Sequence, residues 1–166
     1  MNFLSNLKEK KKNILKIENI YFLLIIAIIF FLDRLSKIKI IKDLNENTYF
    51  INDYINLDLI WNIGIGFGLF STNSFLFYNL VTVLIGIVIL SLFYISIISN
   101  KLDKLIYSII IGGALGNFSD RLIYKAVPDF IDLHYNNFHW FVFNVADIFI
   151  TLGIFALLIS SIIEKN

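Results

Sequence analysis

Four long apolar runs restrict this chain to the few structures that a lipid bilayer permits. Each run is close to the roughly 20 residues that a membrane-spanning helix needs. The runs are continuously apolar rather than alternating, which disfavours a β-barrel. The sequence therefore predicts an all-α membrane protein with four transmembrane helices. We expect these helices at about residues 20–41, 75–98, 105–123 and 140–163.

The first apolar run raises the alternative of a cleavable signal peptide. No small-residue cleavage site follows this run, which ends instead in Asp33-Arg34. We therefore expect an uncleaved first helix, preceded by a basic tail at residues 1–19, and a single membrane domain over residues 1–166.

Charge differs between the two ends of the predicted bundle. The end that carries both termini has eight basic and four acidic residues, whereas the opposite end has six basic and nine acidic residues. Basic loops are retained in the cytoplasm. The sequence thus predicts cytoplasmic termini, with the acidic end of the bundle at the outer face.

The outer segment at about residues 42–70 differs from the helices in its pattern. Tyr49–Ile51 and Leu57–Trp61 have the composition of short strands, and a glycine-containing stretch leads from there to Phe70. We expect a small extracytoplasmic β-sheet followed by an interfacial amphipathic segment, with Trp61 at the depth of the lipid headgroups.

Several classes of site are disfavoured by the composition. The chain has no cysteine, and its net charge of +1 is not organised into a basic face for nucleic acid. It contains no glycine-rich phosphate loop. His134 and His139 are five residues apart, which is not a helical ligand spacing, and they fall in an expected polar outer loop. We therefore expect neither a metal nor an organic cofactor.

Five aspartates stand in or beside the apolar runs, and the predicted topology places all of them at the outer face. A carboxylate near hydrocarbon is costly, which makes each one a candidate functional residue. Two carboxylates held close together share a proton, so one can activate water while the other polarises a carbonyl. This pattern favours the chemistry of an aspartic protease at a membrane surface. The aspartates are Asp33, Asp120, Asp129, Asp132 and Asp147.

Helical spacing groups some of these residues with polar neighbours. Asn117, Asp120 and Arg121 share one helix face, as do Asn144 and Asp147. Structural explanations remain open. A capping ion pair accounts for Asp120 and Arg121, and a favourable helix dipole accounts for Asp147.

Two other functional classes remain as alternatives. A small transporter or proton-relay protein would use the aspartates as a relay, but its ionisable residues should be spread across the membrane depth. A purely structural membrane subunit would leave the paired asparagines and aspartates unexplained. The clustering at one end favours an enzyme.

Five motifs over about residues 20–163 resemble the bacterial lipoprotein signal peptidases (signal peptidase II), in that family's order. The chain departs from the family at Gly66, where alanine is frequent, and at Pro128, where an aliphatic residue is usual. The motifs are Asp33-Arg-Leu-Ser-Lys37, Asn62-Ile-Gly-Ile-Gly-Phe67, Gly116-Asn117-Phe-Ser-Asp120-Arg121, Val127-Pro-Asp129-Phe130 and Phe143-Asn144-Val-Ala-Asp147.

The resemblance implies a membrane aspartyl endopeptidase that removes the signal peptide from diacylglyceryl-modified prolipoproteins by cleaving before the lipidated cysteine. It implies prolipoproteins and membrane lipid as partners, and a monomer in the bacterial cytoplasmic (inner) membrane with its active site at the outer face. It makes Asp129 and Asp147 the catalytic pair, and Asp33 and Lys37 structural supports. The residues expected to bind substrate or order the site are Asn62, Gly64, Asn117, Asp120, Arg121 and Asn144.

Overall fold

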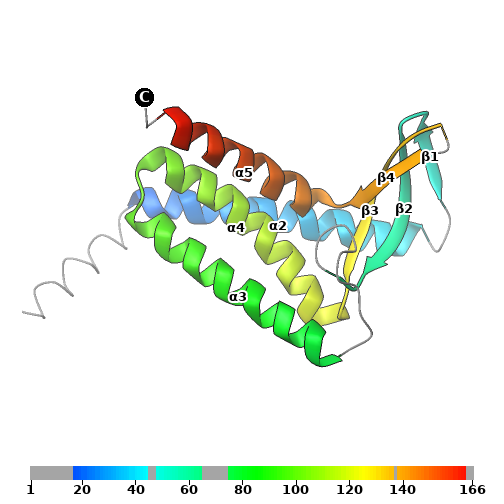
Figure 1. Cartoon of the computed structure of the whole chain (residues 1–166), viewed down its shortest axis with the longest axis horizontal. Coiled ribbons are helices and arrows are strands. Elements are labelled where there is room, and N and C mark those ends of the chain that lie inside the picture. Colours follow the sequence, from blue (N-terminus) through cyan, green and yellow to red (C-terminus); the bar gives the residue numbers. More distant parts are fainter. Residues whose placement is uncertain (1–16, 45–47, 65–74, 137, 164–166) are drawn as a thin grey trace, which may run out of the picture.

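The computed structural model describes residues 17–44, 48–64, 75–136 and 138–163. Within these residues, four long helices form a bundle and a four-stranded antiparallel sheet lies at one end of it (Figure 1). The expected basic tail and the amphipathic stretch at residues 65–70 fall largely outside the described residues. The helices are α2 (Ile17–Asp43), α3 (Phe75–Ile98), α4 (Lys101–Tyr124) and α5 (Val145–Ile163).

Helix α4 lies at the centre of the bundle and packs against α2, α3 and α5. Small residues permit this close packing. A Cβ atom at Gly112 would lie 2.8 Å from Cβ of Ile29 in α2, and one at Gly113 would lie 2.6 Å from the carbonyl oxygen of Ala146 in α5. The central position explains why α4 carries polar side chains: they face the neighbouring helices.

The three helices that surround α4 have the length and the apolar surface of membrane-spanning helices. Mean hydropathy is 1.9 for Asn19–Asp43, 2.8 for Leu76–Ile98 and 2.3 for Val145–Ile163. Large apolar side chains such as Phe31 and Val88 are more than half exposed, as they would be against lipid. The protein is therefore a mostly helical membrane protein with a small antiparallel sheet. That α4 also crosses the membrane stays a prediction.

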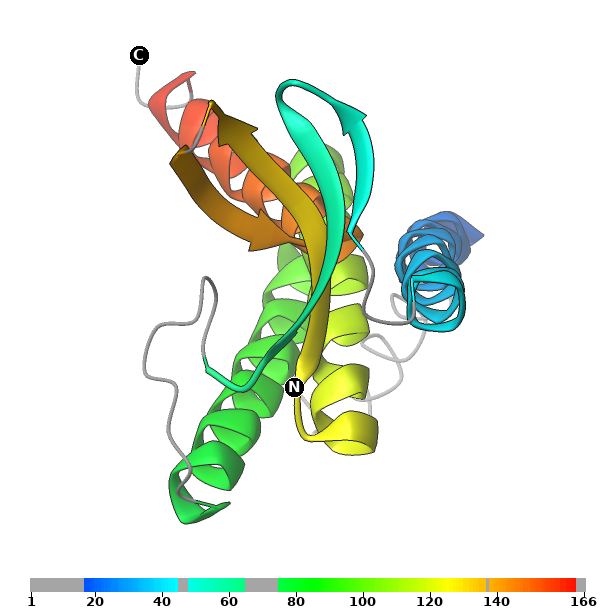
Figure 2. The ribbon, with the colours of Figure 1, turned by 90° about the vertical axis from the view of Figure 1, so that its right-hand side faces the viewer.

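The sheet has the order β1-β2-β3-β4. Its strands are β1 (Tyr49–Asn52), β2 (Ile55–Asn62), β3 (Val127–Tyr135) and β4 (Phe138–Phe143). The first two were expected as short strands. Figure 2, viewed from the sheet end, shows β2 and β3 running across the ends of the helices.

Strands β3 and β4 correct the sequence-based expectations. The residues between the third and fourth predicted helices were expected to form an outer loop, but they include the strand Val127–Tyr135. The fourth helix was expected to begin at about residue 140, whereas α5 begins at Val145. The residues of β4 are mostly aromatic or β-branched, which favours a strand. Because these residues are also apolar and directly precede α5, hydropathy alone placed the start of the helix too early.

Two further features fix the direction of the chain. Lys125 adopts a left-handed conformation (φ 57°) as the cap of α4 and turns the chain into β3. The start of α2, the end of α5 and the α3–α4 junction all lie at the end of the bundle opposite the sheet (Figure 1). The sheet therefore covers the ends of the helices that carry the conspicuous polar residues.

Candidate active site

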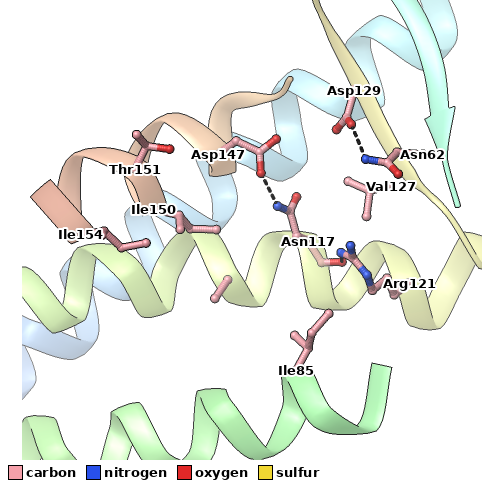
Figure 3. Close-up of a pocket in the computed structure, with 11 residues that line it drawn as sticks. Asn62, Ile85, Asn117, Arg121, Val127, Asp129, Asp147, Ile150, Thr151 and Ile154 are labelled. Carbon is pink, nitrogen blue, oxygen red and sulfur yellow. Dashed lines mark hydrogen bonds between the residues drawn. The ribbon is translucent and has the colours of Figure 1, made fainter. Parts of the chain in front are cut away.

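A cavity of about 330 Å³ lies where the sheet meets helices α3, α4 and α5. Its polar lining gathers near the sheet, and apolar side chains of α5 continue it along the bundle (Figure 3). The cavity therefore has a polar part beside the sheet and an apolar part along α5. The lining residues are Asn62, Ile85, Ala114, Asn117, Arg121, Val127, Asp129, Asp147, Ile150, Thr151 and Ile154.

Asp129 on β3 and Asp147 in the first turn of α5 both line this cavity and share one hydrogen-bonding partner. The side chain of Asn144 donates to Oδ1 of Asp129 at 2.6 Å. The backbone amide of Asn144 donates to Oδ2 of Asp147 at 3.1 Å, and its side-chain oxygen accepts from the amide of Asp147. Asn144 therefore holds the two carboxylates beside one another.

The outer segment contributes Asn62 and Gly64 to the same site. The Asn62 amide group donates to Oδ2 of Asp129 at 2.9 Å, and its oxygen accepts from the backbone amide of Gly64. The carbonyl of Gly64 accepts a hydrogen bond from the Arg121 guanidinium at 3.1 Å. The pairing of Asn62 with Val127 in the sheet makes this possible. Four of the predicted site residues thereby form one connected chain.

Asn117 connects the site to a buried cluster of charges. Its amide group donates to Oδ1 of Asp147 at 2.8 Å, and its side-chain oxygen accepts from Nζ of Lys37 at 2.8 Å. Lys37 also donates to Asp33 and to Asp120, each at 2.7 Å. Lys37, Asp33 and Asp120 are fully buried, so this lysine shares one positive charge between two carboxylates, and Arg34 supplies a second positive charge to Asp120.

The buried cluster also fixes the start of α5. Oδ1 of Asp33 accepts from the backbone amide of Ala146 at 2.9 Å, one residue before Asp147. Asp33, Lys37, Asp120 and Asn144 lie behind the cavity and are not part of its lining. Sequence reasoning missed Arg34, which pairs with Asp120. The signal was present, because Arg34 is adjacent to Asp33 at the polar end of an apolar helix.

The Asp129 carboxyl has an unusual proton affinity. The pKa of Asp129 is raised to about 6, mainly by burial and also by the negative charge of Asp147. The hydrogen bonds from Asn62 and Asn144 oppose this rise because they favour the ionised form. Asp129 thus keeps its proton at pH values where an ordinary carboxyl has lost it, which suits a group that donates a proton.

Of the five aspartates, Asp132 neither lines the cavity nor belongs to the buried cluster. It is buried on β3, and its Oδ2 lies 2.7 Å from Nδ1 of His139 on β4. Its role is therefore separate from that of Asp129.

We expect Gly116→Ala to destabilise the protein by about 1–3 kcal/mol, the usual cost of overpacking. A Cβ atom at Gly116 would overlap Oδ2 of Asp33 and lie 3.0 Å from its Cγ, which displaces the carboxylate that binds Lys37. The measurement is thermal unfolding in detergent micelles. Gly86→Ala is the matched control, because its Cβ would meet only the Phe118 ring at 3.3 Å. Equal unfolding temperatures for the two variants would contradict this account of Gly116.

The sequence matches one family model, described as signal peptidase (SPase) II, over residues 25–163. It is 45% identical over 158 residues to the lipoprotein signal peptidase of Pelagibacter ubique, covering 93% of this chain and 95% of that protein. It is 38% identical over 151 residues to the lipoprotein signal peptidase of Anaplasma phagocytophilum, covering 87% of this chain and 93% of that protein.

Solved structures of bacterial membrane enzymes have a similar fold. One superposes with a TM-score of 0.75 at 26% identity, covering 88% of this chain and 90% of that chain. A second superposes with a TM-score of 0.70 at 27% identity, covering 84% of this chain and 91% of that chain. The similarity therefore extends over the helices and the sheet together.

Proposed function

Because the chain belongs to the signal peptidase II family, we propose that it is an aspartic endopeptidase that removes the signal peptide from diacylglyceryl-modified prolipoproteins, cleaving before the lipidated cysteine. We assign Asp129 and Asp147 as its catalytic pair. The observation that carries this assignment is that both carboxylates line one cavity and bind the same residue, Asn144.

The proposed reaction uses water and the two carboxylates. Ionised Asp147 takes a proton from the water as its oxygen attacks the scissile carbonyl carbon, and Asp129 donates its proton to the carbonyl oxygen. A tetrahedral diol results. When it collapses, the C–N bond breaks, Asp147 passes its proton to the leaving nitrogen, and Asp129 recovers a proton from the diol. Both carboxylates return to their starting state.

The rest of the cavity suits a lipid-modified peptide. Ile85, Ile150 and Ile154 provide an apolar wall that can accept an acyl chain or a signal-peptide side chain. Arg121 and Asn117 lie on the polar side, where their donors can bind carbonyl oxygens of the substrate backbone. We therefore assign Asn62, Gly64, Asn117 and Arg121 to substrate binding or site order, and Asp33, Lys37, Asp120 and Asn144 to support of the dyad.

The test of this function uses the purified protein in detergent with a diacylated prolipoprotein. We expect release of the signal peptide, detected as a shift in the mass of the lipoprotein. The transporter alternative predicts proton or solute flux in vesicles with no cleavage, so cleavage without flux excludes it. A precursor whose cysteine is not lipidated is the substrate control and should be processed poorly.

We also propose a location and a topology. All four helices, including α4, would span the bacterial cytoplasmic membrane, with both termini in the cytoplasm and the sheet at the outer face. The basic excess at the end that bears the termini supports this orientation.

We expect kcat/KM to fall as the pH rises through about 6, because Asp129 then loses the proton that it must donate. Asn62→Ala removes a hydrogen bond that favours ionised Asp129, so the pKa should rise and the alkaline limb should move to higher pH. The measurement is the pH dependence of kcat/KM for both proteins. A limb that moves to lower pH in the Asn62 variant would contradict the assignment of Asp129 as the proton donor.

A further inference from the structure

The β3–β4 hairpin gathers three ligand-type side chains on one face. Asp132 and His134 are two residues apart on β3, and side chains at that separation point to the same face of a strand. His139 on β4 pairs directly with His134 across the sheet. The expectation of no metal depended on placing both histidines in a loop, where residue spacing says little. The hairpin brings them together.

The three side chains are close enough to bind one ion. Their potential ligand atoms all lie within 4.8 Å of one another. Nδ1 of His139 is 2.7 Å and Nδ1 of His134 is 3.7 Å from Oδ2 of Asp132. Ligand atoms in a tetrahedral zinc site lie about 3.3 Å apart, as follows from bonds of about 2.0–2.2 Å. Small side-chain rotations therefore suffice to complete the geometry.

Two buried atoms in this group lack a conventional partner. Nδ1 of His134 and Oδ1 of Asp132 have no hydrogen-bond partner among the residues that the structure describes. The side chains of His134 and Asp132 are only 9% and 5% exposed, so bulk water does not satisfy these atoms well. A cation bound by Nδ1 of His134 and by both carboxylate oxygens of Asp132 would satisfy these two atoms.

We propose that Asp132, His134 and His139 bind a divalent transition-metal ion, with Zn²⁺ as the best-fitting ion. Two imidazoles and one carboxylate suit Zn²⁺, whereas Mg²⁺ and Ca²⁺ prefer oxygen ligands alone. The ion would take the place of the hydrogen bond between Nδ1 of His139 and Oδ2 of Asp132. The His139 side chain is 56% exposed, which leaves a path for the ion and a fourth position for water.

The ion binds outside the peptidase cavity, because none of its three ligands lines that cavity. Asp132 is three residues from Asp129 on the same strand, and this odd separation places the two side chains on opposite faces of β3. The ion therefore cross-links β3 and β4. It stabilises the strand that carries Asp129 and takes no part in peptide hydrolysis.

The experiment is a metal titration of the full chain in detergent, purified through a tag that contains no histidine and stripped with a chelator. We expect one Zn²⁺ per chain by calorimetry, and visible d–d absorption when Co²⁺ is used as a probe. His139→Gln should weaken Zn²⁺ binding at least about tenfold. This variant changes an exposed side chain, so it should fold, and unfolding temperatures measured without metal check that it does.

Asp53→Asn is the matched control, because Asp53 is an exposed carboxylate in the turn between β1 and β2. It should bind Zn²⁺ as the unmodified protein does, and Mg²⁺ should bind to neither. The proposal is overturned if no Zn²⁺ binds, or if His139→Gln and His134→Gln bind it as tightly as the unmodified protein. Cleavage of a prolipoprotein by chelated protein leaves this inference intact, because the ion is not a reactant.

Discussion

Asp129→Asn and Asp147→Asn should each abolish cleavage of a diacylated prolipoprotein, with a loss in kcat of at least about 10³-fold. The asparagine amide matches carboxylate in size but can neither remove a proton from water nor donate one to a carbonyl oxygen. The effect should be on kcat rather than on KM, because both residues act on the reacting atoms. The measurement is the rate of signal-peptide release by purified protein under conditions of substrate saturation.

Asp53→Asn is the control for this pair, since it removes an exposed carboxylate of the outer segment without touching the cavity. It should cleave at the rate of the unmodified protein. Both dyad variants should accumulate in the membrane at normal levels. If either one retains more than about a tenth of the normal rate, the assignment of the dyad is wrong, because general acid–base groups contribute more than this.

Lys37→Met should destabilise the protein by about 3–5 kcal/mol, the cost of removing one partner from a buried ion pair. Lys37 is fully buried and is bound by Asp33 and Asp120, and the Asn117 side chain accepts its third hydrogen bond. Methionine has a similar length and volume, so the loss is mainly electrostatic. Thermal unfolding in detergent and the amount of protein in the membrane measure this effect.

Lys39→Met is the matched control, since Lys39 lies on the same helix with its side chain exposed. It should change the free energy of unfolding by less than about 0.5 kcal/mol, as surface substitutions usually do. An unfolding temperature for Lys37→Met equal to that of Lys39→Met would show that the buried cluster does not hold the bundle together.

Helices α2, α3 and α4 were predictable from the length and hydropathy of their apolar runs. The α3 helix covers the expected range 75–98, and α2 and α4 extend a few residues beyond the expected ranges. The strands after α4 were not predictable in the same way. Most residues of β4 are apolar, like those of α5, so hydropathy could not separate Phe138–Phe143 from this helix. Only pairing with β3, which depends on the whole fold, distinguishes them.

The candidate site was partly predictable. Motif resemblance selected Asp129 and Asp147, and helical spacing grouped Asn117 with Asp120 and Arg121. Neither could reveal that Arg34 pairs with Asp120, because 86 residues separate them. Nor could they show that Asn62 binds Asp129 across 67 residues. Such contacts depend on how distant helices and strands pack together. The helical or strand periodicity of a local segment gives no information about them.

The hydrogen bond from Ala146 to Asp33 has a consequence for how the protein is made. Its two partners are 113 residues apart, at opposite ends of the chain. When the first helix leaves the ribosome, Asp33, Arg34 and Lys37 have no partners from α4 or α5, which have not yet been synthesised. Until those helices are made, these charged side chains must be solvated by water or paired within the first helix. Asp147, which belongs to the proposed catalytic pair, lies in the last helix, so a nascent chain gains this pair only after α5 has been inserted.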